Sequence, residues 1–120
     1  MVTIKKFTEI IAWQKAHELA LSVYSITSKF PRSEDFGLTS QMRRATVSVP
    51  SNIVEGFKRK SVKDGVNFYN IAEGSLEELK YQLLLSKDLK YISDDAYKKV
   101  DNLATEVGFL LFGWKKSQKI

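Results

Sequence analysis

The stretch Gln41–Ser61, QMRRATVSVPSNIVEGFKRKS, decides the fold of this 120-residue chain. Apolar residues recur through it, and just before it, at steps of three and four, which is the spacing of one buried face of a helix. These residues are Leu38, Met42, Ala45, Val49 and Ile53. The spacing therefore predicts a helix over residues 38–58, although a proline lies near its middle.

Pro50 leaves two interpretations of this helix open. Proline lacks the N–H that would bond to the Thr46 carbonyl, and its ring crowds that carbonyl. In the first interpretation the helix bends at Pro50. In the second it breaks at Ser48 and a new helix starts at Pro50, because proline is favoured in the first turn of a helix. The apolar spacing continues across the proline, which favours a kink.

Three further segments have helical spacing, over about residues 10–30, 62–90 and 94–114. The first should end before Pro31, since the residue before a proline avoids helical geometry. Ser61 and Ser93 are expected N-caps of the other two. The predicted inner positions are Ala12, Ala16, Leu19, Val23, Ile26 and Phe30; Phe68, Ala72, Leu76, Leu79 and Leu83; and Ala96, Val100, Leu103, Val107, Leu110 and Trp114.

Four amphipathic helices with short joints predict an all-α fold, an antiparallel up-down-up-down four-helix bundle. The length fits a single domain over residues 1–120. Gly74 lies inside the third helix, where glycine costs about 1 kcal/mol relative to alanine. We expect the close approach of another backbone to compensate for this cost.

The composition excludes several kinds of chemistry. The chain has no cysteine, which rules out disulfides, thiolate zinc sites and a cysteine nucleophile, and is compatible with the reducing cytoplasm. The start of the chain lacks the apolar region of a signal peptide, and no stretch is apolar for long enough to span a membrane. We therefore expect a cytoplasmic protein with no membrane partner.

Neither a catalytic centre nor a metal site is predicted. His17 is the only histidine, and adjacent acids such as Asp94 and Asp95 diverge around a helix. Gly56 and Gly65 lack the spacing of a phosphate-binding loop. The chain is therefore expected to be non-enzymatic, without catalytic residues, metal or cofactor.

A line of polar side chains runs beside the apolar face of residues 38–58. Four of them are Arg44, Ser48, Asn52 and Glu55, and the third helix offers Ser75 and Glu78 at matching spacing. Arg59 extends the line, and Glu55 and Arg59, four residues apart, have the acid-first order that favours an ion pair. We interpret the polar side chains as a structural network between the two helices, in which a buried Arg44 pairs with a carboxylate such as Glu78. A polar pocket or a nucleic-acid contact is the competing interpretation.

Basic residues cluster at the joint between the second and third helices. They are Lys58, Arg59, Lys60 and Lys63, and Arg43 is expected to add to them from the same helix. The chain carries a formal net charge of +5. Clustered cations on a basic protein favour binding of RNA or DNA phosphates. An ordinary solvated turn is the alternative.

Three runs of sequence resemble a known family. They are WQKAH from Trp13, TSQMRRATVSVPSNIVEG from Thr39 to Gly56, and FYNIAEGSLEEL from Phe68 to Leu79. Together they resemble the bacterial four-helix-bundle proteins called 23S rRNA intervening-sequence proteins, although Val54 stands where alanine is expected in NIAEG. The resemblance implies a bundle with a kinked second helix, assembled into a homopentamer, and it carries over no catalytic residues.

The same resemblance extends to the accessory variability proteins of diversity-generating retroelements, which bind nucleic acid and a reverse transcriptase. We therefore expect a non-enzymatic homo-oligomer that binds RNA or DNA through its basic residues. The alternative is a structural scaffold whose partner is a protein, such as a reverse transcriptase.

Overall fold

The computed structural model describes residues 3–118, and this part of the chain contains helices and connections but no strand. The long helices are α1 (Ile11–Thr27), α2 (Leu38–Lys58), α3 (Val62–Asp88) and α4 (Asp94–Ser117). Two short 3-10 helices, η1 (Phe7–Glu9) and η2 (Arg32–Glu34), precede α1 and α2. The prediction of an all-α chain with four long helices is confirmed.

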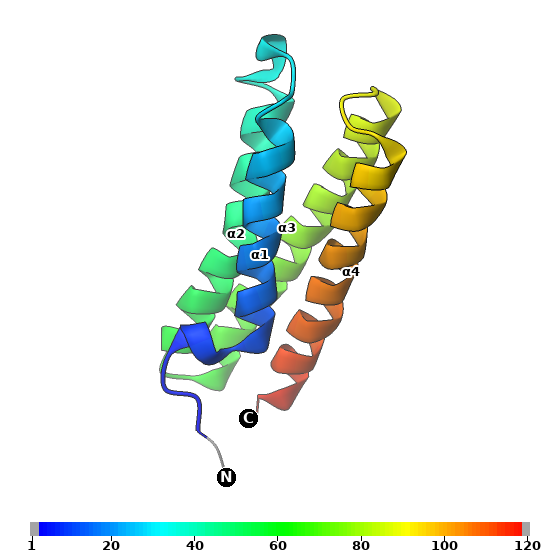
Figure 1. Cartoon of the computed structure of the whole chain (residues 1–120). Coiled ribbons are helices and arrows are strands. Elements are labelled where there is room, and N and C mark those ends of the chain that lie inside the picture. The colour runs from blue at the N-terminus through cyan, green and yellow to red at the C-terminus, as the bar shows by residue number, and fades with distance from the viewer. Residues whose placement is uncertain (1–2, 119–120) are drawn as a thin grey trace.

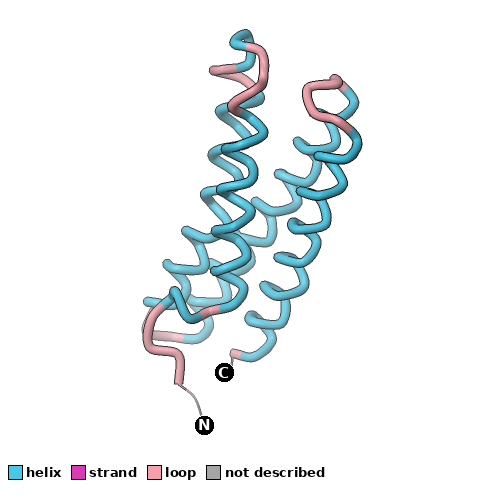
Figure 2. The backbone as a smooth tube through the Cα atoms, in the orientation of Figure 1, coloured by secondary structure: helices cyan, strands magenta, loops and turns pink. Residues whose placement is uncertain are grey.

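The connections lie at the two ends of an elongated molecule. The α1–α2 and α3–α4 connections lie together at one end in Figure 1, and the α2–α3 connection lies at the other. Both ends of the described chain also lie at that second end (Figure 1). Figure 2 shows that the middle of the molecule consists of helix alone.

Two helix ends differ from the predicted ones by three residues, and the other bounds agree to within two. α1 ends at Thr27, before the predicted end at Phe30, and the chain continues through turns in which the Phe30 N–H bonds to the Thr27 carbonyl at 3.1 Å. Phe30 still packs in the core, so its apolar spacing indicates burial correctly although its backbone is not helical. α4 extends to Ser117, beyond the predicted end at Trp114.

α2 is one continuous helix with Pro50 inside it. The interpretation in which the helix breaks at Ser48 and restarts at Pro50 is therefore wrong. Pro50 is itself buried, as are Val49 and Ile53 on either side of it. Burial of this face against the rest of the bundle offsets the loss of one backbone hydrogen bond.

The core runs the length of the bundle and takes side chains from all four helices. All five positions predicted for α2 are buried. In α4 the buried face is rotated: Ala104 and Leu111 are fully buried, whereas the predicted Leu103 and Leu110 are half-buried. In α3 the buried aromatic residue is Tyr69, and the predicted Phe68 lies at the edge.

Two glycines let α2 and α3 approach closely where they are joined. A Cβ atom added at Gly65 would lie 2.9 Å from the Gly56 carbonyl oxygen, and one added at Gly56 would lie 2.8 Å from the Gly65 carbonyl oxygen. Gly74 behaves differently, since an added Cβ there would meet no atom of the described chain within 4 Å. The expectation that Gly74 admits another backbone is therefore wrong within the protomer.

Candidate nucleic-acid interface

The α2–α3 joint presents its basic residues to solvent. Lys58, Arg59, Lys60 and Lys63 are all exposed. The Ser61 hydroxyl accepts a hydrogen bond from the Asp64 N–H at 3.1 Å, so Ser61 caps α3 as predicted. The cap and the close approach of Gly56 to Gly65 hold the joint on both sides. The four cations, which are close in the sequence, are therefore also close in space.

Arg59 differs from the three lysines of the cluster because its guanidinium has partners. Its Nη2 atom lies 2.9 Å from the Glu55 carboxylate, and the group lies 4.4 Å above the centre of the Phe68 ring. The pair of Glu55 with Arg59, expected from their spacing of four, is confirmed, whereas the predicted place of Glu55 in the network with α3 is wrong. Within residues 3–118, Lys58, Lys60 and Lys63 form no ion pair.

Other cations lie at the same end of the bundle, because both ends of the described chain lie there (Figure 1). The cations that add to the cluster are Lys5, Lys6, Lys115 and Lys116, and the acids are Glu9, Glu55, Asp64 and Glu73, of which Glu73 pairs with Lys115 at 2.6 Å. At the opposite end the cations Lys29, Arg32, Arg43, Arg44, Lys87, Lys90, Lys98 and Lys99 are offset by the acids Glu34, Asp35, Asp88, Asp94, Asp95 and Asp101. The end that holds the α2–α3 joint therefore has the larger excess of positive charge, and we call it the basic end.

Arg43 does not belong to the basic end. Its Nε donates to the Thr27 hydroxyl at 3.0 Å, its Nη2 donates to the Tyr24 carbonyl at 3.4 Å, and its guanidinium lies 4.5 Å from the centre of the Tyr24 ring. At a rise of 1.5 Å per residue, Arg43 lies roughly 22 Å from Lys58 along α2. The expectation that Arg43 adds to the cluster at the joint is wrong, because this side chain joins α2 to α1.

The polar line on α2 does connect to α3, but through fewer residues than predicted. The hydroxyls of Ser48 and Ser75 lie 2.8 Å apart, and the Asn52 amide donates to the Ser48 hydroxyl at 2.9 Å and to its carbonyl at 2.8 Å. Ser48, Asn52 and Ser75 thus form the predicted link between the two helices.

The ion pair expected between Arg44 and Glu78 is absent. The two side chains line one open hollow of about 370 Å³, yet no ion pair within 4 Å joins them. Both residues are exposed. An arginine in water loses no solvation and needs no carboxylate partner, so the premise that Arg44 is buried is wrong.

A tie between the two connections at the opposite end was not predicted. The Glu34 carboxylate accepts a hydrogen bond from the Leu38 N–H at 3.1 Å and another from the Tyr91 hydroxyl at 2.8 Å. The Leu38 bond, and then the Tyr91 bond, lower the pKa of Glu34, while the bond to Glu34 raises the pKa of Tyr91. The sequence signals neither bond, because Glu34 lies outside the N-cap position of α2, which is Gly37, and Tyr91 is far along the chain.

The described residues hold no cluster of three or more histidine, cysteine or acidic side chains with the geometry of a metal site. His17 is exposed and stacks on Trp13, with ring centres 5.1 Å apart. None of the helices in residues 3–118 has the length and apolar character needed to cross a membrane.

The fold and the charge distribution define a small helical-bundle protein with a basic surface at one end. The family model for the 23S rRNA-intervening sequence protein matches residues 8–113, and the chain belongs to this family. The family predicted from the three sequence runs is therefore confirmed. Kinship with the retroelement accessory proteins stays a prediction.

A solved structure supports the same assignment. The chain is similar to a protein of unknown function from the S23 ribosomal protein family of Bacteroides thetaiotaomicron, with a TM-score of 0.79 and 27% sequence identity. The match covers 89% of this chain and 100% of that one. No curated protein matches the sequence.

Proposed function

We propose that this protein is a non-enzymatic nucleic-acid-binding protein that holds RNA or DNA against its basic end. The observation that carries the proposal is the set of exposed lysines at the α2–α3 joint, Lys58, Lys60 and Lys63, which have no ion-pair partner in the described chain. Lysines that are free of carboxylates can neutralise the phosphates of a nucleic acid. The counterions condensed on the nucleic acid are then released, and this release is the main source of non-specific affinity.

The joint suits phosphates for a second reason, which is that its backbone is held in place. The Gly56–Gly65 contact and the Ser61 cap fix the start of α3, and Lys63 lies in its first turn. The N-terminal end of a helix carries a partial positive charge that favours anions. Asp64 lies in the same turn and weakens this attraction, so the lysine charges provide most of the affinity for phosphates.

We also propose that the protein works as an oligomer, a homopentamer of antiparallel up-down-up-down bundles in which α2 is bent at Pro50. The family resemblance is the basis for the pentamer and the bend. The exposed apolar side chains of α4 support self-association, since Phe109 is 76% exposed and Phe112 is 51% exposed. A ring would repeat the basic end on each subunit and raise the avidity for a long nucleic acid.

A protein-binding scaffold, with a partner such as a reverse transcriptase, is the second candidate function. It is favoured by an apolar groove of about 450 Å³ on α1 and α2, whose lining includes Trp13, Leu21, Val47 and Val54. Leu21 is 61% exposed at this groove. The cytoplasmic location stays a prediction from the absence of cysteine.

Charge reversal at the joint tests the first function. The variant is K58E/K60E, and the matched control is K98E/K99E, which reverses two exposed neighbouring lysines of α4. Fluorescence anisotropy would be measured with a structured RNA and with duplex DNA at several salt concentrations. We expect the affinity of the wild type to fall steeply with salt, K58E/K60E to bind at least about tenfold more weakly, and the control to bind nearly as the wild type does.

Three results would contradict the nucleic-acid function: no binding at low salt, an affinity that does not change with salt concentration, or an equal loss of affinity in K58E/K60E and K98E/K99E. The scaffold function makes a different prediction. L21D should abolish capture of a protein partner and leave RNA affinity unchanged, whereas K58E/K60E should retain that partner.

A further inference from the structure

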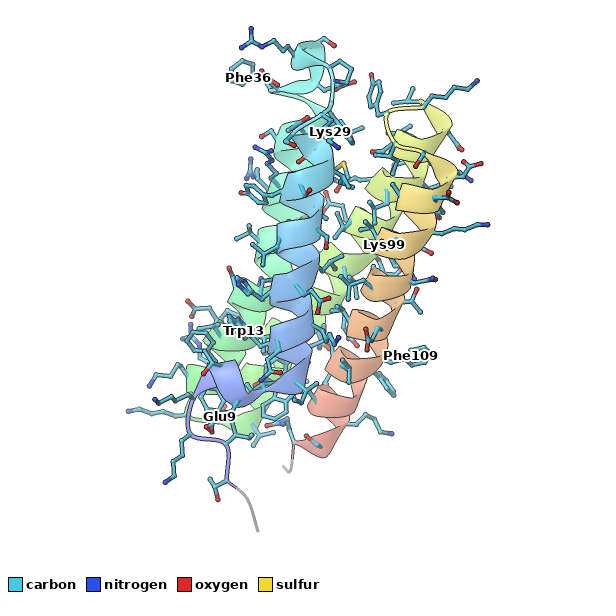
Figure 3. The ribbon with its side chains drawn as sticks, in the orientation of Figure 1. Glu9, Trp13, Lys29, Phe36, Lys99 and Phe109 are labelled. Atoms are coloured by element: carbon cyan, nitrogen blue, oxygen red, sulfur yellow. The ribbon has the colours of Figure 1, made fainter. Side chains whose placement is uncertain are left out.

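Phe36 is a fully exposed aromatic side chain on a well-held connection. Its relative exposure is 100%, and Figure 3 shows it at the outer tip of the α1–α2 connection. The backbone around it is ordered by hydrogen bonds from the Glu34 N–H to the Pro31 carbonyl at 2.9 Å and from the Gly37 N–H to the Glu34 carbonyl at 3.0 Å. The Phe36 ring is thus held in water, although its burial would be favourable. An exposed aromatic ring of this kind is typical of a residue that contacts a binding partner.

An open hollow of about 630 Å³ lies beside this ring, between the α1–α2 connection and α2. Its volume falls within the roughly 300–1,000 Å³ of small-molecule sites. Tyr24, 44% exposed, provides a second aromatic wall, and the Arg43 guanidinium lies across that ring. The hydrogen bonds of Arg43 to α1 fix the position of its charge.

The polar groups of the hollow suit an anion and a hydrogen-bonding ring. Arg44 lines it, is exposed, and forms no ion pair within residues 3–118. Thr39 also lines it, and the Thr39 hydroxyl is buried without a hydrogen-bond partner. Asp35 is the acid of the lining; it would repel a phosphate close to itself but can accept hydrogen bonds from base N–H groups.

We propose that this hollow, the Phe36–Arg44 hollow, binds one unpaired nucleotide of a single-stranded nucleic acid. The base stacks on the aromatic walls and the phosphate lies at Arg44. Aromatic rings joined with arginines are the usual means of holding single strands, because every base has a face that stacks. This inference rests on the proposed function and adds a second contact, at the end of α2 opposite the basic end.

The two contacts can be tested apart because they are well separated. α2 separates Phe36 from Lys58 by roughly 30 Å at 1.5 Å per residue. A tetranucleotide with stacked bases spans roughly 14 Å, at the 3.4 Å rise per nucleotide of a duplex strand, which is less than the roughly 21 Å between Arg44 and Lys58 along α2. The experiment is a titration of the full chain with single-stranded tetraadenylate, followed by NMR and by calorimetry.

The variants are F36A and R44Q, with F109A as the matched control, since Phe109 is an exposed phenylalanine on α4. We expect F36A to weaken tetraadenylate binding roughly 5- to 150-fold, as is usual for loss of one stacking platform. R44Q should also weaken it and reduce its salt dependence, while F109A and K98E/K99E should leave it within about twofold of the wild type. Circular dichroism would confirm that each variant is folded.

Several results would overturn the proposal: no binding of tetraadenylate, equal losses in F36A and F109A, or competition by a short blunt duplex as strong as that by the single strand. A fall in molecular mass on F36A would also overturn it, since Phe36 would then contact a second copy of the chain. If K58E/K60E weakens binding of long RNA while F36A leaves tetraadenylate binding unchanged, this inference fails and the proposed function stands. If F36A weakens tetraadenylate binding while K58E/K60E leaves binding of long RNA unchanged, the proposed function of the basic end fails and this inference about the hollow stands.

Discussion

The carbonyl oxygen of Gly56 faces Gly65 so closely that a Cβ atom added at Gly65 would lie 2.9 Å from it. The oxygen belongs to backbone and cannot move aside as a flexible side chain can. We therefore expect G65A to destabilise the protein by about 1–3 kcal/mol through overpacking. Urea denaturation, with the midpoint and slope compared between variants, measures this cost.

Gly74 provides the matched control for this substitution. It lies inside the same helix, and an added Cβ meets nothing within 4 Å. G74A should therefore stabilise the protein by about 0.5–1 kcal/mol, because alanine restricts the unfolded chain. If G65A proved as stable as G74A, the close approach of α2 and α3 would be wrong. If G74A were destabilising, Gly74 would have a neighbour outside the protomer.

The link between Ser48 and Ser75 should contribute to stability, whereas Arg44 should not. Removal of one hydroxyl in S75A is expected to cost about 0.5–1.5 kcal/mol, as for a single hydrogen bond. R44A should change the free energy of unfolding by less than about 0.5 kcal/mol, because this side chain is exposed and unpaired in the described chain. A double-mutant cycle with S48A and S75A measures their coupling, and a coupling near zero would contradict the observed contact.

The tie between Glu34 and Tyr91 predicts a dependence of stability on pH. The folded protein holds the pKa of Glu34 below its ordinary value of 4.5, so this group stabilises the fold above that value. The contribution is lost as the pH falls through the folded pKa. The pKa of Tyr91 is raised from 10.0, so its contribution is present below that value and is lost as the pH rises through the folded pKa.

Y91F removes the hydroxyl and with it the alkaline dependence, and it should reduce the acid dependence, part of which stays because the Leu38 N–H still bonds to Glu34. The stability difference between the wild type and Y91F should be largest near neutral pH and should shrink under acid and under strongly alkaline conditions. Urea midpoints measured across the pH range test this, with Y81F, at an exposed tyrosine of α3, as the control. A difference that is the same at every pH would mean that Tyr91 acts by packing alone.

The apolar surface of α4 predicts the behaviour of the oligomer. If the protein is a pentamer, light scattering should give a mass about five times the 13.7 kDa of one chain. F109E/F112E should reduce this mass, since a buried interface does not accept two carboxylates. F36E should leave it unchanged. An unchanged mass in F109E/F112E would place the interface elsewhere on the bundle.

Much of the fold is readable from the sequence because helical spacing reports burial directly. All five inner positions predicted on α2 are buried, including those around Pro50. Spacing alone is not enough for α4, because Ala104 and Leu111 form an apolar line beside the predicted Leu103 and Leu110, and the spacing does not show which of the two lines is buried. The close approach of Gly56 to Gly65 depends on how two helices cross, which neither glycine signals by itself.

The sequence predicts the parts of the candidate site that are formed by residues close together in the chain. It does not predict the contacts that depend on the direction of a side chain. Lys58, Lys60 and Lys63 are exposed together because a short joint carries them. Arg43 lies on the same helix but roughly 22 Å from Lys58, so helix geometry alone excludes it from the joint. Only its contact with Tyr24 on α1 depends on how the helices pack. The predicted pairing of Arg44 with Glu78 fails because it assumes burial.

The placement of both ends of the described chain at the basic end has a practical consequence for biochemistry. An affinity tag or a fluorophore attached beyond residue 118, or before residue 3, sits next to Lys58–Lys63 and competes with a nucleic acid for that surface (Figure 1). A polyhistidine tag would add further cations there below neutral pH. The α3–α4 connection, residues 89–93, is no better place for a reporter group, because its Tyr91 bonds to Glu34 at the end that holds the Phe36–Arg44 hollow.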